Sequence, residues 1–106
     1  MEALNQEDFR EKVYFGDNKC AVLFTAPWCG FCRSMKLMAE KAERDFAQTV
    51  FFTVDIDQEP ALKTAFGISA VPTLIVFEDG KPLNKATGLL KKSELYTLLG
   101  AEVKIK

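Results

Sequence analysis

The sequence contains no histidine and only three cysteines among its 106 residues. Without an imidazole there is neither a histidine base nor a histidine-containing metal site. Lys and Arg number 14 against 15 Asp and Glu, a formal net charge of −1, whereas a nucleic-acid binder normally carries a basic excess. No stretch approaches the ~18 uncharged apolar residues of a transmembrane helix. We therefore expect neither nucleic acid nor a membrane as a partner.

The chain length predicts a single domain over residues 1–106, because two domains would each be too small to bury a dependable core. A monomer is the default at this size. The first residues, Met1 to Asp8, lack the basic and apolar regions of a secretory signal. The default compartment is then the reducing cytosol, where a close cysteine pair is more often catalytic or metal-binding than structural.

Apolar runs and turn residues alternate along the chain in the manner of an α/β protein. Asn5 and Asp8 predict the start of a first helix and Gly16 its end. Asp79-Gly80 predicts a hairpin turn. The predicted strands cover 20–25, 50–56, 73–77 and 82–87, and the later helices cover 32–47, 60–67 and 93–99. This order predicts a three-layer sandwich: a mixed sheet of about four to five strands flanked by about four helices, with the first three strands parallel.

The chemistry concentrates in Trp28-Cys29-Gly30-Phe31-Cys32, where a predicted strand ends and a helix begins. Cysteines three apart on a first helical turn lie within disulfide range, at a Cα separation of roughly 5–6 Å. The free N–H groups and dipole of the helix stabilise a thiolate and lower the pKa of Cys29. We expect exposed Cys29 to attack a substrate disulfide and shielded Cys32 to resolve the mixed disulfide. Trp28 would flank the sulfur, and Gly30 would let a partner backbone approach.

A Cys-x-x-Cys pair is also half of a zinc or iron–sulfur site, so metal binding is the alternative to redox chemistry. A structural zinc takes four protein ligands, and beyond the pair only Cys20 and carboxylates remain. Cys20 begins a predicted buried strand, where a free cysteine ordinarily serves as inert packing. We therefore expect no bound metal and a disulfide redox function for Cys29 and Cys32.

Several separate segments together resemble the thioredoxin family over nearly the whole chain. The segments are 26–32 (Ala-Pro-Trp-Cys-Gly-Phe-Cys), 54–58, 66–68, 71–73, 77–80 and Gly88. The resemblance implies a thioredoxin fold with a cis bond between Val71 and Pro72. It also implies that the backbone of Val71 pairs with an extended substrate segment. The implied contact surface consists of Trp28, Gly30, Pro72, Thr73, Gly88 and Leu89, with Phe31 in the active-site loop.

The resemblance further implies a general protein disulfide reductase that binds no cofactor. A thioredoxin-reductase-type partner would supply its electrons, and its substrates would be proteins that contain disulfides. Two alternatives stay open: a more oxidising disulfide oxidase or isomerase, and a non-catalytic binding module on the same scaffold.

The sequence departs from the family pattern at four positions. The family's buried aspartate, six residues before the first cysteine, is replaced by Leu23, and the lysine that approaches it is replaced by Thr53. We expect that resolution by Cys32 is slower as a result, or that it depends on water or on a group of the substrate. Phe31 and Leu37 replace two prolines of the family. These changes predict a somewhat more oxidising potential and a straighter helix.

Overall fold

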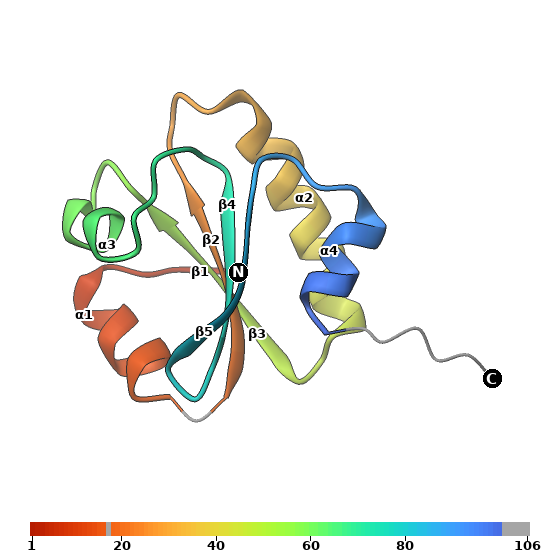
Figure 1. Ribbon diagram of the computed structural model, residues 1–106, viewed down its shortest axis with the longest axis horizontal. Helices are drawn as coiled ribbons and strands as arrows, with labels where there is room; N and C mark the ends of the chain where they lie inside the picture. The colour runs from red at the N-terminus through yellow and green to blue at the C-terminus, as the bar shows by residue number, and fades with distance from the viewer. Residues whose placement is uncertain (17, 101–106) are drawn as a thin grey trace.

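The computed structural model describes residues 1–16 and 18–100, which form one five-stranded sheet between two layers of helices (Figure 1). The strand order is β1-β3-β2-β4-β5. In chain order the elements are β1 (Glu2–Ala3), α1 (Gln6–Phe9), the π-helical turn η1 (Arg10–Tyr14), β2 (Lys19–Thr25), α2 (Gly30–Asp45), β3 (Thr49–Asp55), α3 (Pro60–Ala65), β4 (Thr73–Glu78), β5 (Lys81–Thr87) and α4 (Lys92–Leu98). The predicted α/β sandwich with a mixed sheet is confirmed.

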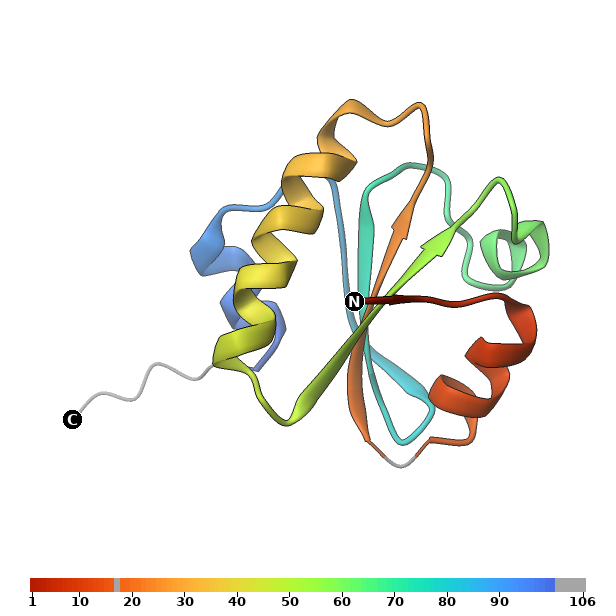
Figure 2. The same cartoon turned by 180° about the vertical axis from the view of Figure 1, so that it is seen from behind.

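Helices cover both faces of the sheet, as Figures 1 and 2 show from opposite sides. α1 and α3 lie over one face, and α2 and α4 lie over the other. Along β2, Val22 and Phe24 join the core under α1 and α3, whereas Ala21 and Leu23 join the core under α2 and α4. All four side chains are fully buried. Burial on both faces explains why the sequence of β2 is continuously apolar rather than alternating.

The prediction that the first three strands are parallel is wrong for β4. β2 and β3 are parallel, but β4 runs antiparallel to β2. A strand of seven residues spans about 23 Å. The 16-residue helix α2 spans about 24 Å, enough to return the chain to the end of the sheet where β2 begins. The six residues of α3 span only about 9 Å and cannot do so. The chain therefore begins β4 at the same end of the sheet where β3 finishes.

Local signals at the element ends are mostly confirmed. The Asn5 side chain accepts a hydrogen bond from the Asp8 N–H at 2.7 Å and caps α1. Asp79 and Gly80 have φ values of 53° and 80°, the left-handed pair of a tight hairpin turn. The first helical stretch ends at Tyr14 with Phe15 as its C-cap, so Gly16 follows at the predicted stop position, although its φ is not left-handed. It is needed for space, because a Cβ there would collide with the carbonyl oxygen of Lys12.

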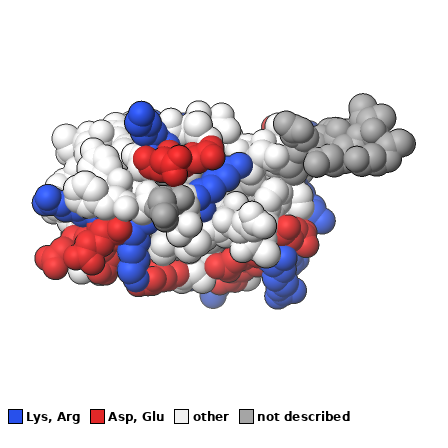
Figure 3. Space-filling model, turned by 90° about the horizontal axis from the view of Figure 1, so that it is seen from below, with Lys and Arg blue, Asp and Glu red and all other residues white. Residues whose placement is uncertain are grey.

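The loops that surround the redox pair lie at one end of the sheet. At one end β2 runs into α2, and the loops before β4 and α4 lie at that same end (Figure 1). The opposite end carries acidic and basic side chains interspersed with uncharged ones (Figure 3). No helix among residues 1–16 and 18–100 is long and apolar enough to cross a membrane.

Candidate functional site

Cys29 occupies the N-cap position of α2, directly after the turn that follows β2. Its backbone is extended, with φ −88° and ψ 115°, and its N–H donates to the carbonyl oxygen of Ala26 at 3.2 Å. The Sγ of Cys29 accepts a hydrogen bond from the N–H of Cys32 at 3.1 Å. A side chain that accepts from the first helical turn is the usual solution for the unpaired N–H groups there. A sulfur fills that role here, so the helix start and the redox site are one feature.

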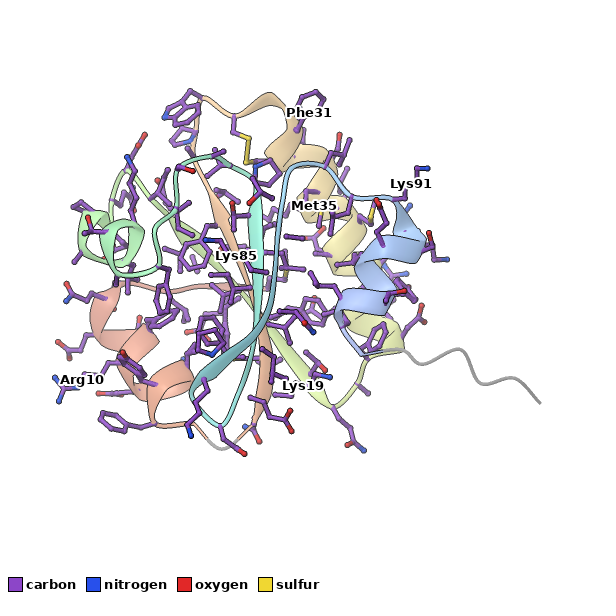
Figure 4. All side chains as sticks on the ribbon, in the orientation of Figure 1. Arg10, Lys19, Phe31, Met35, Lys85 and Lys91 are labelled. Carbon is purple, nitrogen blue, oxygen red and sulfur yellow. A yellow bond between two sulfur atoms is a disulfide. The ribbon has the colours of Figure 1, made fainter. Side chains whose placement is uncertain are left out.

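Cys29 and Cys32 form a disulfide with their Cα atoms 5.4 Å apart, and Figure 4 shows its yellow bond beside the start of α2. The two sulfurs are not equivalent. Cys29 is half-buried at the margin of the core under α1 and α3, whereas Cys32 is 6% exposed. An approaching molecule therefore meets Cys29 first. The sequence predicted both the pairing distance and this difference in exposure.

Trp28 lies beside the disulfide with 67% of its surface exposed, as the sequence predicted. Its indole Nε1–H donates to a carboxylate oxygen of Asp57 at 2.9 Å. Asp57 follows β3, and its own N–H donates to the Asp55 carboxylate at 2.8 Å. The hydrogen bond fixes the ring of Trp28 on the α3 side of the disulfide. No local sequence pattern predicts the contact between Trp28 and Asp57, because 29 residues separate them.

The segment before β4 is held beside the disulfide by the sheet register. Thr73 pairs with Phe24 across β2 and β4, and the half-buried Val71 packs against the same core as Cys29. The bond between Val71 and Pro72 is cis, as the resemblance implied. Val71, Pro72 and Thr73 thus lie at the same end of the sheet as the redox pair.

Hydrogen bonds fasten this segment to the end of β5. The Gly88 N–H donates to the Pro72 carbonyl oxygen at 2.7 Å. The buried Thr73 hydroxyl donates to the Ala70 carbonyl oxygen at 2.6 Å and lies 3.3 Å from the Thr87 hydroxyl. Gly88 has a φ of 95°, a conformation that favours glycine. Sequence reasoning missed Thr87, which has no signal apart from this tertiary contact.

The interior beneath the disulfide is apolar. Leu23 is 0% exposed and lies between Thr53 of β3 and Leu74 of β4. Among residues 1–16 and 18–100, the buried polar or charged residues are Thr49 and Thr73, so no buried carboxylate lies in the described part. Leu23 and Thr53, the two departures from the family's aspartate and lysine, are direct neighbours across β2 and β3. They therefore replace one interacting pair rather than two unrelated residues.

Cys20 lies near the start of β2, far from the redox pair. It is a free thiol, 2% exposed, and burial raises its pKa to about 11. Thiols react as thiolates, so a thiol with this pKa is inert near neutral pH. The prediction that Cys20 is core packing is confirmed. Within the described residues, no three His, Cys, Asp or Glu side chains come together as a metal site would require.

Comparison with known proteins places these features in a family. Residues 1–101 match the Thioredoxin family. Thioredoxin of Chlamydia muridarum is 31% identical over 99 residues, covering 93% of this chain and 95% of the relative. Thioredoxin of Alicyclobacillus acidocaldarius is 33% identical over 97 residues, covering 91% of each. The crystal structure of Malassezia sympodialis thioredoxin (Mala s 13) has a TM-score of 0.84 at 25% identity, covering 93% of this chain and 87% of that one.

The fold and the disulfide at the helix start define a thiol–disulfide oxidoreductase. The chain belongs to the thioredoxin family, which confirms the resemblance drawn from the sequence.

Proposed function

We propose that this protein is a general protein disulfide reductase in which Cys29 is the nucleophile and Cys32 the resolving residue. The asymmetry of the pair carries the proposal: the accessible sulfur of Cys29 accepts the Cys32 N–H at 3.1 Å, whereas Cys32 is 6% exposed. Backbone donors at a helix start stabilise negative charge. They favour Cys29 as the thiolate that attacks first.

The reaction transfers two electrons from the protein to its target. The Cys29 thiolate attacks one sulfur of the target disulfide, and the other target sulfur leaves as a thiolate and takes up a proton. Cys32 then loses its proton and attacks the Cys29 sulfur, which releases the second target thiol. The target gains two thiols, and the protein is left with the Cys29–Cys32 disulfide.

The segment before β4 supports docking of the target chain. The half-buried Val71 supplies its backbone for pairing with an extended segment of the target. Pro72 and Thr73 are themselves buried, so they support this surface from beneath rather than line it. The bond from the Gly88 N–H to the Pro72 carbonyl oxygen and the bond from the Thr73 hydroxyl to the Ala70 carbonyl oxygen order the segment before a target binds. Trp28, Gly30 and Leu89 complete the surface, and a Cβ at Gly30 would meet no atom within 4 Å, so the approach over that residue is open.

The remaining features of the proposal concern the source of the electrons and the setting of the reaction. The electrons reside on the cysteines, so the reaction needs no bound cofactor. A thioredoxin-reductase-type partner regenerates the dithiol after each turnover. The protein acts as a single domain over residues 1–106, as a monomer in the cytosol, in electron transport that maintains cell redox balance.

Insulin reduction tests this function directly. Wild-type protein, recycled by dithiothreitol, is expected to precipitate the insulin B chain. Cys29→Ser is expected to abolish turnover, and Cys32→Ser is expected to trap a mixed disulfide between Cys29 and the target. Cys20→Ala is the control and is expected to retain turnover. If Cys29→Ser keeps the wild-type biological role, the protein is instead a binding module.

The departure at Phe31 favours a second candidate, a disulfide oxidase or isomerase. A typical thioredoxin has a reduction potential of about −270 mV. The loss of proline between the cysteines favours a reduction potential above that value. Trp28, the only tryptophan, adjoins Cys29, so its fluorescence is suited to follow a titration against glutathione. A value at or below about −270 mV would remove the basis for this candidate. Faster refolding of a scrambled substrate than reduction of insulin would favour it.

A further inference from the structure

Phe31 exposes a large apolar ring where the core does not need one. It is 63% exposed, and no aromatic ring of the described residues stacks against it. Figure 4 shows the Phe31 side chain directed outward at the start of α2, beyond the disulfide. An exposed apolar ring at this place gains nothing in the free protein and is typical of a surface that another molecule covers.

Leu89 presents a second apolar side chain on the same flank. It is 46% exposed and lies in the loop between β5 and α4, which passes beside the first turns of α2 (Figure 1). The next residue, Leu90, packs into the same core as Met35 of α2, which fixes the loop against that helix. We call Phe31 and Leu89 the apolar shelf. Trp28 lies on the other flank, held toward α3 by Asp57.

An extended target segment presents alternate side chains to the same side. If the target cysteine points at Cys29, the residues two before and two after it point toward this protein as well, each about 7 Å away along the segment. The exposed apolar side chains that flank the disulfide are Trp28 on one side and the apolar shelf on the other. The disulfide therefore has an apolar contact on either flank for a target that spans both.

We propose that Phe31, together with Leu89, selects targets with a large apolar side chain two residues from the attacked cysteine. This inference rests on the proposed reductase function and adds the substrate class to it. The occupant of the shelf is the same chain that forms the mixed disulfide with Cys29. No separate partner is needed to cover the exposed ring. Burying about 60 Å² of apolar surface favours such a target by about tenfold.

Short peptides test the selection. Each carries one cysteine as a mixed disulfide with a coloured leaving thiol, in a serine background, with Phe or Ser two residues before or after the cysteine. The rate constant of the reduced protein is measured for each peptide. The wild type is expected to prefer one Phe peptide about tenfold over its Ser counterpart. The ratio of the two rates cancels any change in the intrinsic reactivity of Cys29.

Phe31→Ser and Leu89→Ser are each expected to reduce this preference to about threefold or less. Leu37→Ser is the matched control, because Leu37 is an apolar residue of the same helix, 55% exposed and outside the shelf. It is expected to keep the full preference. A wild-type ratio near one, or an unchanged ratio in Phe31→Ser, would overturn the selection while leaving the reductase function standing. Failure of the wild type to reduce any of these peptides, or hydroxyethyl disulfide, would overturn both.

Discussion

Leu23 is the position at which a single substitution tests the apolar interior beneath the disulfide. Leu23 is 0% exposed and contacts a core that includes Met35 and Leu74. Leu23→Asp removes an apolar side chain whose burial is worth about 1.5–3 kcal/mol. It also places a carboxyl group directly opposite Thr53 and Leu74, of which Thr53 is the polar one. The low local polarity disfavours the ionised form, so the pKa of the new carboxyl rises.

The control is Leu23→Asn, which has nearly the same shape as Asp but cannot ionise. The stability difference between the two variants then isolates the charge. The unfolded Asp has a pKa of about 3.9. If burial raises the folded value by about three, the Asp variant loses about 4 kcal/mol relative to Asn between pH 4 and 7. The sign follows from proton binding: the unfolded state releases its proton at a lower pH, so stability falls as pH rises through this window.

Urea unfolding followed by far-ultraviolet circular dichroism measures this difference on the oxidised protein at pH 4, 5, 6 and 7. The free energy of unfolding of a domain of this size is about 5–15 kcal/mol, so a loss of about 4 kcal/mol is readily resolved. A gap between the variants of less than about 1 kcal/mol at every pH would refute the reasoning, because it would mean that water reaches the new side chain. Adding Thr53→Lys to Leu23→Asp is expected to recover part of the loss by pairing the charge.

The same variant tests how Cys32 loses its proton. The wild-type pH–rate profile for release of a mixed disulfide is expected to lack a buried-carboxylate ionisation, because Leu23 is apolar and no carboxylate is buried among residues 1–16 and 18–100. Leu23→Asp is expected to add such an ionisation and to accelerate release. An ionisation of this kind already present in the wild type would count against the expectation.

Three further substitutions probe the scaffold, each read out by denaturant unfolding. Lys19→Met is expected to lose about 0.5–2 kcal/mol, because the Lys19 ammonium donates to the Leu99 carbonyl at 2.8 Å and lies at the negative end of α4; the exposed Lys41→Met is the control, and an equal effect would sink the idea. Cys20→Ala is expected to lose less stability between pH 9 and 11 than the wild type, by about 2 kcal/mol, because the unfolded thiol ionises in that window well before the folded one; parallel curves would contradict this. Thr73→Val is expected to destabilise by about 1–2 kcal/mol more than Thr87→Val, since it removes the donor to the Ala70 carbonyl; equal losses would show that the contact with Thr87 dominates.

Local physics made most of the elements predictable. The predicted helix over 32–47 and the observed α2, Gly30–Asp45, differ by two residues at each end. At the start, the difference arises because Cys29 itself is the cap, so the helix begins before the second cysteine. Asp79-Gly80 was a reliable hairpin signal because both residues tolerate a positive φ. Spacing alone set the redox pair within bonding distance.

The features that the sequence did not predict depend on distant partners. The direction of β4 follows from the length of α3 relative to the strands, a comparison that no single segment contains. β1 has two residues, too few for any periodic pattern. The bonds from Trp28 to Asp57 and from Thr73 to Thr87 join residues that only the folded sheet brings together. The sequence shows which residues are suited to such contacts, and the topology decides which of them meet.

The location of the disulfide explains how this fold combines stability with redox turnover. Closing a ring of only four residues restricts the unfolded chain by about 2 kcal/mol, a minor share of the stability of a domain of this size. The two cores lie along β2 and β4, whereas the disulfide lies beyond the end of β2, so its reduction breaks a bond within the first turn of α2 and none of the hydrogen bonds of the sheet. Cys20 lies about 17 Å or more away along the same strand, and with its pKa near 11 its thiol stays protonated and does not join the exchange. The fold thus confines thiol chemistry to the pair at the start of α2, where breaking the disulfide leaves the hydrogen bonds of the sheet in place.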